Sequence, residues 1–363
     1  MSKMTGFFGL TRDDIRKACL DLGASEQHIK TLMVWAYKGF YDSWREEVSV
    51  SRKLLSYARD NWSLDVPEVA LANKSRYDRS VKFLLQMADG EQVEAVLMPE
   101  TNRLTLCLSS QVGCAQKCGF CYTGRMGLKR QLSTHEIVGQ VIAVNRWILA
   151  HPDYLKDCRL EPFQRVSNIV FMGMGEPLDN TEALIPALQV MADDYALQLA
   201  QKRMAVSTAG HLDGLKALLK ELPHTPIAFS LHAVDSSARS RLMPINRRYD
   251  FRDILDFMKE HYHKSHQKGW LLIQFTLISG VNDDLDTARK LAQLVADMPV
   301  KINLIPLNEI DPSRFESPEA KRLLDFRDVI HRAGVRVMIR YSKGQDINAA
   351  CGQLVVNGTS QNL

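Results

Sequence analysis

The sequence lacks several features that would assign it to a particular class of protein. Its 363 residues contain no run of about 18 apolar residues that would cross a membrane, and the first residues lack the apolar segment and cleavage site of a secretory signal. The formal net charge is only +4, which does not by itself predict nucleic-acid binding. No internal repeat or low-complexity tract is found. These absences predict a soluble, cytoplasmic, globular protein without membrane contact.

Paired cysteine motifs are also scarce. The seven cysteines are an odd number in a long chain without a secretory signal, which favours reduced thiols over a disulfide framework. Three of them, Cys114, Cys118 and Cys121, form a CxxxCxxC cluster just after an apolar run. A structural zinc site needs four ligands, and no second pair supplies the fourth. Three thiolates on an iron–sulfur cluster would leave one iron free to bind a small molecule, and this is the favoured interpretation.

The periodicity of apolar residues changes along the chain. Apolar residues recur at helical spacing from residue 11 to about 65. Over 81–87 and 93–98 they recur at every second residue, as in strands, and Asp89-Gly90 between these two segments is a hairpin turn signal. After residue 135, helices and strands alternate, with strands expected at 168–173, 203–208, 226–231, 271–278, 301–306 and 336–341. This alternation predicts a parallel sheet. Because no GxGxxG turn opens the first unit, a full or partial α/β barrel is favoured over an open doubly wound sheet.

We expect three regions: a helical accessory domain over 1–75, a β-hairpin extension over 76–102, and a barrel core over 103–363. Aromatic residues in the helical region, such as Trp35, Tyr37 and Trp44, can stack on bases, but a core role is more common at helical spacing. The basic run Arg239-Ser-Arg241 can contact phosphates, although a solvated surface is the more common role. Polar segments 150–167 and 309–317 are expected surface loops.

Polar and small residues gather where the predicted strands end. In a parallel α/β barrel the active site lies at these carboxyl ends, so each such residue is a candidate for function. Singly, each has an ordinary explanation as a turn, a helix cap or a core residue. Together they predict one barrel mouth formed by the cysteine loop, Gly173-Met-Gly-Glu176-Pro177, Ser207-Thr-Ala-Gly210, Ser230-Leu-His232, Asn308 and the loop from Gly344 to Cys351.

The cysteine cluster, with Phe120 before its last cysteine, resembles the signature of the radical S-adenosylmethionine (SAM) superfamily. Further motifs, in order along nearly the whole chain, resemble the radical SAM enzymes that methylate adenine in RNA: Val93-Glu94-Ala-Val, Leu106-Cys107-Leu-Ser-Ser, Phe171-Met-Gly-Met-Gly-Glu-Pro, Ser230-Leu-His, Met243-Pro-Ile-Asn and Asp346-Ile-Asn-Ala-Ala-Cys-Gly-Gln-Leu. Ser109-Ser-Gln-Val-Gly and Lys301-Ile-Asn-Leu-Ile-Pro look more like the dual-specificity rRNA/tRNA adenine-C2 methyltransferases than their adenine-C8 relatives. The resemblance implies a partial (β/α)6 radical SAM barrel.

The resemblance also implies a reaction. Direct displacement is not available at adenine C2, which carries no nucleophilic lone pair, so a radical route is needed. In that family one SAM methylates the residue matching Cys351, and a second SAM yields the radical that activates this methyl group for addition to C2. Glu94 matches the proposed acceptor of the C2 proton. Cys107 matches the thiol that attacks Cys351, forms a transient disulfide and releases the RNA.

The remaining implied assignments concern cofactors and partners. Cys114, Cys118 and Cys121 would hold a [4Fe-4S] cluster, and two SAM molecules would be used per turnover. SAM would be bound by Phe120, Gly175, Glu176, Ser207, Ser230, Leu231, His232 and Asn308. The expected partners are 23S rRNA, tRNA and an electron donor such as flavodoxin or ferredoxin, with the enzyme a monomer whose N-terminal domain recognises RNA shape.

Three alternatives stay open at this point. The enzyme can act at C8 instead of C2, or on only one of the two RNAs. A more distant alternative is a zinc-containing RNA-binding module without catalysis.

Overall fold

A single ten-stranded sheet forms the centre of the protein, whose computed structural model describes residues 4–155, 165–264, 271–310 and 314–355. Its strand order is β14-β13-β12-β11-β10-β9-β6-β5-β4-β3. The parallel part comprises β6 (Arg103–Cys107), β9 (Asn168–Phe171), β10 (Met204–Thr208), β11 (Ile227–Ser230), β12 (Leu271–Leu277), β13 (Val300–Pro306) and β14 (Arg336–Ile339). Within the described ranges β3 and β14 are the two edges, so the barrel is partial, as expected.

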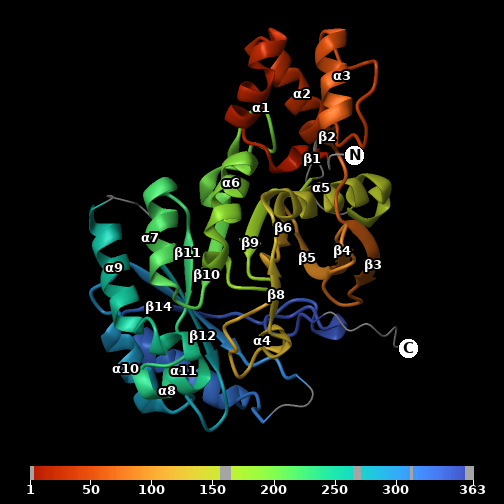
Figure 1. Cartoon of the computed structure of the whole chain (residues 1–363). Coiled ribbons are helices and arrows are strands. Elements are labelled where there is room, and N and C mark those ends of the chain that lie inside the picture. The colour runs from red at the N-terminus through yellow and green to blue at the C-terminus, as the bar shows by residue number, and fades with distance from the viewer. Residues whose placement is uncertain (1–3, 156–164, 265–270, 311–313, 356–363) are drawn as a thin grey trace.

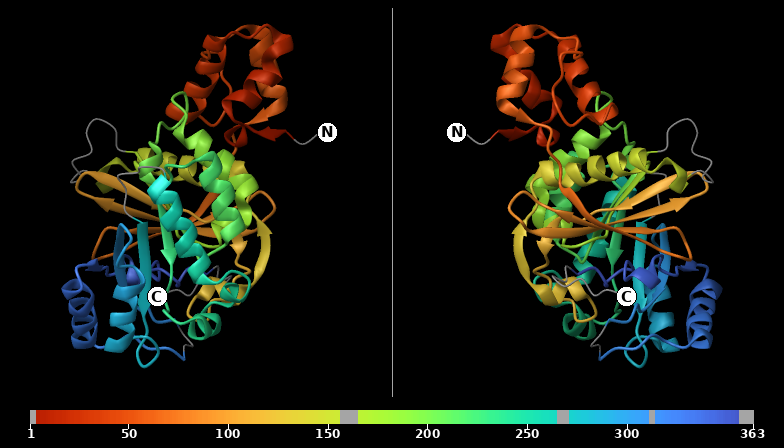
Figure 2. Two further views of the ribbon diagram at one scale, coloured as in Figure 1. Left: turned by 90° about the vertical axis from the view of Figure 1, so that its left-hand side faces the viewer. Right: turned by 90° about the vertical axis from the view of Figure 1, so that its right-hand side faces the viewer.

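Helices follow the parallel strands and cover the outer side of the curved sheet (Figures 1 and 2). They are α5 (Thr134–Ala150), α6 (Thr181–Ala192), α7 (Leu212–Glu221), α8 (Ser236–Leu242), α9 (Phe251–Lys264), α10 (Leu285–Leu294) and α11 (Ala320–Arg332). Each strand–helix–strand connection brings the chain back in the same direction, so all the carboxyl ends of these strands meet at one edge. None of the helices in the described part of the chain is both long and apolar enough to span a bilayer.

An antiparallel extension continues the sheet beyond β6. It consists of β5 (Gln92–Glu100), β4 (Val81–Gln86) and β3 (Glu68–Lys74). The predicted hairpin around Asp89-Gly90 is confirmed as β4 and β5. The expectation that residues 1–75 are helical is wrong for β3, which is an exposed edge strand with little alternation of apolar residues; even its Leu71 is 57% exposed.

The N-terminal helices α1 (Arg12–Cys19), α2 (Glu26–Lys38) and α3 (Arg52–Asn61) form a separate group at one end of the molecule, beyond α5 and α6 (Figure 1). Short strands β1 (Thr5–Gly6) and β2 (Trp62–Ser63) pair beneath them. Tyr37 and Trp44 are buried in the core with Phe7 at ring distances of 6.0 and 4.9 Å, which confirms the core role for these two aromatics.

Most predicted strands and helices of the barrel agree with the structure to within a few residues. The sequence did not predict α4 (Tyr122–Met126), α8 or the small pair β7 (Gln111–Gly113) and β8 (Leu128–Gln131), because elements this short repeat the apolar pattern too few times for it to be recognised. Cys158 and parts of the two expected surface loops, residues 156–164 and 311–313, lie outside the described residues.

Candidate active site

The cysteine loop is framed by short secondary structure. It leaves β7 at Gly113 and ends at α4, and the Cys114 N–H donates to Gly127 O at 3.0 Å to close its base. Gly113 has a φ of 78°, and a Cβ there would lie 1.8 Å from Gly127 O, so only glycine permits this closure. The frame turns all three predicted ligand cysteines into one cavity at the carboxyl ends of the strands.

The three thiols line one cavity and are the ligand type that iron–sulfur clusters take. No three Cys, His, Asp or Glu side chains among the described residues are grouped closely enough to hold one metal ion. A single zinc draws its thiolates to about 2.3 Å from one point, whereas a cubane cluster binds each thiolate to a different iron and so needs a wider triangle. Burial raises the pKa of Cys114 to about 12 and also raises the pKa of Cys118 and Cys121, so a cationic cluster is what would stabilise three thiolates here.

The same cavity contains nearly all the residues predicted to bind SAM. We call it the cluster cavity; among its lining residues are Cys114, Cys118, Cys121, Phe120, Gly175, Glu176, Ser207, Ser230, His232, Asn308 and Cys351. Three predicted site residues do not line it. Leu231 is buried behind it, and Glu94 and Cys107 lie elsewhere, as described below. The structure therefore brings the strand-end motifs together at one mouth.

Gly175 and Glu176 form a turn over β7. Gly175 has a φ of 101°, and a Cβ there would lie 2.7 Å from Gln111 Cβ. The Glu176 carboxylate accepts hydrogen bonds from Leu178 N at 3.1 Å and Ala209 N at 2.7 Å. Burial raises its pKa to about 7. A buried carboxylate held by two amides beside a glycine turn suits the ammonium group of an amino-acid ligand.

The ends of β10 and β11 are held by an arginine that the sequence did not single out as structural. Arg239 is fully buried, and its guanidinium donates to the carbonyls of Ala209, Ser230 and Leu231 at 2.6, 2.9 and 3.0 Å. Burial lowers its pKa to about 10. The expectation that this basic run contacts phosphates or solvent is therefore wrong for Arg239, because its guanidinium is buried and hydrogen-bonds to the carbonyls at two strand ends.

His232 follows β11 in a left-handed conformation, with a φ of 56°. Its Nδ1 accepts a hydrogen bond from Thr276 N at 2.9 Å, and its ring meets the Phe120 ring edge-on at 5.0 Å. Burial lowers its pKa to about 3, so the ring is neutral. These two rings give the cavity an apolar wall on which a ligand ring can pack.

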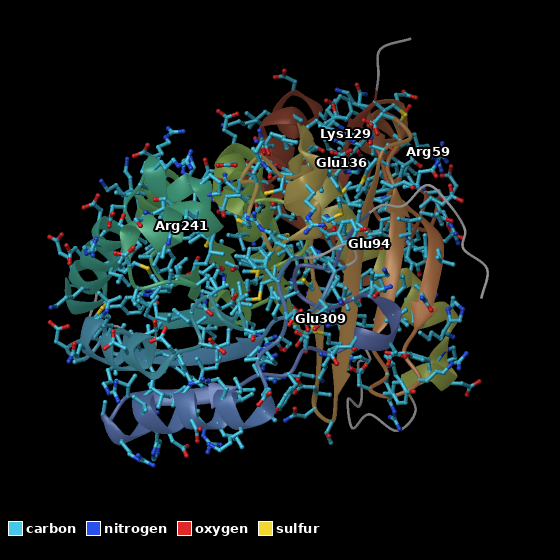
Figure 3. The ribbon with its side chains drawn as sticks, turned by 90° about the horizontal axis from the view of Figure 1, so that it is seen from below. Arg59, Glu94, Lys129, Glu136, Arg241 and Glu309 are labelled. Atoms are coloured by element: carbon cyan, nitrogen blue, oxygen red, sulfur yellow. The ribbon has the colours of Figure 1, made fainter. Side chains whose placement is uncertain are left out.

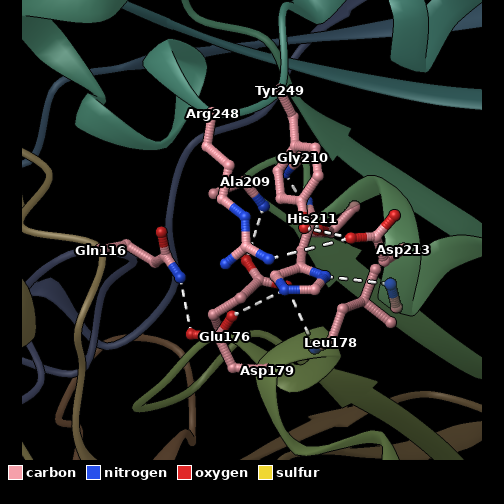
Figure 4. Close-up of polar contacts among 12 residues, drawn as sticks. Gln116, Glu176, Leu178, Asp179, Ala209, Gly210, His211, Asp213, Arg248 and Tyr249 are labelled. Carbon is pink, nitrogen blue, oxygen red and sulfur yellow. Dashed lines mark hydrogen bonds and ion pairs between the residues drawn. The ribbon is translucent and has the colours of Figure 1, made fainter.

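A polar network ties the cysteine loop to the turn of Glu176 (Figure 4). Gln116, which lies between the first two cysteines, donates to Asp179 Oδ2 at 2.6 Å, and His211 Nε2 lies 3.5 Å from Asp179 Oδ1. Asp179 is three residues from Glu176 in the same turn. Gln116 therefore joins the cysteine loop directly to the turn that contains Glu176. Sequence reasoning missed this network because no motif joins residues so far apart in the chain.

Cys351 is exposed on a loop that three parts of the fold hold in place. Asn308 Nδ2 donates to Cys351 O at 3.1 Å, and Tyr122 N, at the start of α4, donates to Gly352 O at 2.7 Å. The third support is a set of hydrogen bonds from β4 and the turn between β3 and β4 to residues of this loop. The predicted loop cysteine thus lies at the mouth of the cluster cavity with its backbone fixed.

A second cavity lies on the other side of Cys351. Cys351 and Cys107 both line it, and Cys107 is nearly buried, which raises its pKa to about 12. One carboxylate, Glu100, faces six cationic side chains in it: Arg103, Lys202, Arg203, Lys301, Arg340 and Lys343. We call it the cationic cavity. The six cysteines in the described residues are free thiols, so the transient Cys107–Cys351 disulfide stays a prediction.

Glu94, labelled in Figure 3, lies on β5. It is on the face of the sheet that also carries Cys107, since β5 pairs with β6 through Val96 and Cys107. The pattern alone indicated an outward-facing residue, but Glu94 is only 4% exposed. Its Oε2 accepts a hydrogen bond from Val355 N at 2.9 Å, and the preceding residue, Leu354, lines the cationic cavity. The end of the described chain therefore contacts this carboxylate and, through the adjacent residue, lines the cavity.

Comparison with known proteins agrees with this geometry. No family model matches the sequence. The chain is 37% identical over 348 residues to a protein of Bdellovibrio bacteriovorus named dual-specificity RNA methyltransferase RlmN, covering 96% of this chain and 83% of that protein. Proteins of the same name from Desulfotalea psychrophila and Vesicomyosocius okutanii are 37% and 33% identical over 355 residues, covering 97% of this chain and 95% and 96% of theirs. The crystal structure of a radical SAM methyltransferase from Sphaerobacter thermophilus superposes with a TM-score of 0.87 at 30% identity, covering 97% of this chain and 99% of that one.

Proposed function

Because the chain belongs to the family of dual-specificity RNA methyltransferases named RlmN, we propose that it methylates C2 of one adenosine in 23S rRNA and of the adenosine 3′ to the anticodon in tRNA. One observation carries the proposal. Cys351 borders both the cluster cavity, where SAM would bind, and the cationic cavity, which suits an RNA phosphate backbone. A methyl group on the Cys351 thiol would lie between SAM in the cluster cavity and RNA at the cationic cavity.

The residues of the cluster cavity would hold the cofactors. Cys114, Cys118 and Cys121 would bind the [4Fe-4S] cluster. SAM, of which two molecules would be used per turnover, would be bound by Phe120, Gly175, Glu176, Ser207, Ser230, Leu231, His232 and Asn308. When bound, this pair supplies a radical that removes a hydrogen atom from a methyl group. The chain contributes the rest: Glu176 orients the SAM ammonium group, and the Phe120 and His232 rings exclude water from the reacting end.

Cys351, Cys107 and Glu94 would carry the covalent steps. Cys351 Sγ first takes a methyl group from SAM, and this carbon, after losing one hydrogen atom, bonds to adenine C2. Glu94 accepts the proton that C2 must lose, and the cluster, when bound, would take back the unpaired electron of the adduct. Cys107 Sγ then attacks Cys351 Sγ, and the S–C bond breaks with its electron pair on carbon, which takes up a proton to complete the methyl group. The resulting disulfide needs an external thiol to reduce it.

Anaerobic reconstitution with iron and sulfide tests the proposal. The protein is incubated with methyl-deuterated SAM, a reductant and rRNA or tRNA fragments, and the nucleosides are analysed by mass spectrometry. We expect deuterated 2-methyladenosine from the wild type and none from Cys351→Ala, which should also carry no methyl group on its own C-terminal peptide. RNA methylation by Cys351→Ala would refute the two-step route, and 8-methyladenosine would favour the C8 alternative.

Three further expectations belong to the same proposal. The N-terminal region 1–75, whose helices α1 to α3 lie away from the barrel core, would recognise RNA shape. The electron would come from a flavodoxin or ferredoxin. The enzyme would work as a monomer in the cytoplasm.

A further inference from the structure

Lys82 joins two parts of the site that the mechanism treats separately. It lies on β4, and its ammonium group is 3.0 Å from Glu94 Oε1 and donates to Asn348 O at 3.2 Å. The side chains of Lys82 and Glu94 are only 16% and 6% exposed. Strand register sets this position, because Lys82 pairs with Val96, which in turn pairs with Cys107. One ammonium group therefore touches both the buried carboxylate and the loop that carries Cys351.

The β3–β4 turn adds further contacts to the same loop. Asp78 Oδ2 accepts a hydrogen bond from Gly344 N at 2.7 Å, and Asp346 Oδ2 accepts one from Arg76 N at 3.0 Å. Asn348, the residue that Lys82 contacts, has a φ of 51°, a left-handed conformation that needs support from its surroundings. The antiparallel extension thus supports the Cys351 loop as well as widening the sheet.

We propose that Lys82 is a positioning residue that keeps Glu94 ionised and aligned with the Cys351 loop at the step in which the adenine C2 proton is removed. The inference rests on the function proposed above for Glu94 and Cys351. In this step the C2–H bond breaks, the proton passes to a Glu94 oxygen, and the bonding pair stays in the purine ring. The ring regains its conjugation once the adduct has also returned its unpaired electron to the oxidised cluster.

The charges around Glu94 give Lys82 a direct role in this step. Burial raises the pKa of Glu94, and the two groups that oppose this are the Lys82 ammonium group and the Val355 N–H. Among the described residues, these are the charged and hydrogen-bonding groups that face its carboxylate. Without Lys82 the carboxylate would keep only one amide donor, its pKa would rise further, and it would be protonated when it has to accept a proton.

The experiment compares variants at the adduct stage. Lys82→Met removes the charge and keeps the length of the stem, Lys82→Arg keeps the charge, and Glu94→Gln removes the acceptor. Lys129→Met is the matched control, since Lys129 makes an ion pair of 2.8 Å with Glu91 on the nearby surface but is 59% exposed. Single-turnover reactions are quenched over time, the covalent protein–RNA adduct is measured on denaturing gels, and methylation of Cys351 is measured separately by peptide mass.

We expect every variant to methylate Cys351 and form the adduct. Lys82→Met should resolve it at least about tenfold more slowly at neutral pH, because loss of the ammonium group raises the pKa of Glu94, and the rate should recover as the pH is raised. Lys82→Arg and Lys129→Met should follow the wild-type pH profile. If Lys82→Met does not fold, Lys82→Gln, which keeps a donor for both partners without the charge, should show the same alkaline shift.

Wild-type kinetics and pH profile in both neutral Lys82 variants would overturn the inference. Other outcomes would instead show that the proposed function is wrong. If Glu94→Gln resolves the adduct normally, Glu94 is not the acceptor. If the wild type never methylates Cys351, the two-step route itself is wrong. If Glu94→Gln arrests the adduct while the neutral Lys82 variants do not, only the role of Lys82 fails.

Discussion

Replacing Arg239 by methionine should damage both stability and SAM binding, and the structure indicates by how much. The arginine makes four hydrogen bonds while fully buried: three to backbone carbonyls at the ends of β10 and β11, and one to Asn246 Oδ1 at 2.9 Å. Asn246 Oδ1 also accepts from Phe251 N, and Leu231 O from Ala233 N, so both keep a partner.

The carbonyls of Ala209 and Ser230 are the groups that lose most when Arg239 is replaced. Each buried acceptor left unpaired costs about 1–3 kcal/mol, and the two bonds lost at the other acceptors add about 1 kcal/mol together after the arginine's own desolvation is relieved. The expected loss in the free energy of unfolding is therefore about 3–7 kcal/mol. Because these strand ends carry Ser207, Ser230 and His232, SAM affinity should fall as well.

Urea unfolding followed by circular dichroism, with SAM titration of the folded protein, measures both effects. Arg241→Met is the control, because Arg241 lies on the same short helix but is exposed and bonds only to Ser237 among the described residues (Figure 3). It should change stability by no more than about 0.5 kcal/mol. If Arg239→Met is as mild as Arg241→Met, the conclusion that this arginine joins the strand ends is wrong.

Other predictions address the SAM turn and the release step. Since burial raises the pKa of Glu176 to about 7, the carboxylate becomes neutral as the pH falls through that value, so SAM binding measured by calorimetry should weaken toward pH 6; an equally steep decline in Glu176→Gln would exclude this residue as the cause. Gly175→Ala places a Cβ 2.7 Å from Gln111 Cβ at a φ of 101°; it should cost about 1–3 kcal/mol of stability in thermal unfolding and abolish SAM binding, and normal binding would show that the turn adapts. Cys107→Ser should accumulate the protein–RNA adduct on denaturing gels, and normal release would remove Cys107 from the mechanism.

The sequence predicted the barrel because its strands and helices are long enough to show their periods, and the carboxyl-end rule then placed the polar motifs at one mouth. The cysteine cluster and the Cys351 loop were visible because their chemistry is local. The structural role of Arg239 could not be predicted, since a run of basic residues has the same pattern whether it faces solvent or joins two strands.

The burial of Glu94 also could not be predicted from the sequence pattern. Its alternation in a hairpin strand indicated a solvent-facing side chain, but the face that it shares with Cys107 is covered by the end of the described chain. The partner that balances its charge, Lys82, comes from the neighbouring strand, and its second contact lies more than 260 residues away. Sequence patterns within one strand cannot reveal a contact that depends on how distant segments fold together.

The central claim, that this chain methylates C2 of adenosine in two RNAs through Cys351, is tested most directly by the modified nucleosides of a strain that lacks the gene. Digested 23S rRNA and tRNA are analysed by mass spectrometry before and after complementation with the wild type or Cys351→Ala. We expect 2-methyladenosine to disappear from both RNA pools of the deletion strain, to return with the wild type and not to return with Cys351→Ala. Unchanged 2-methyladenosine in both pools of the deletion strain would contradict it.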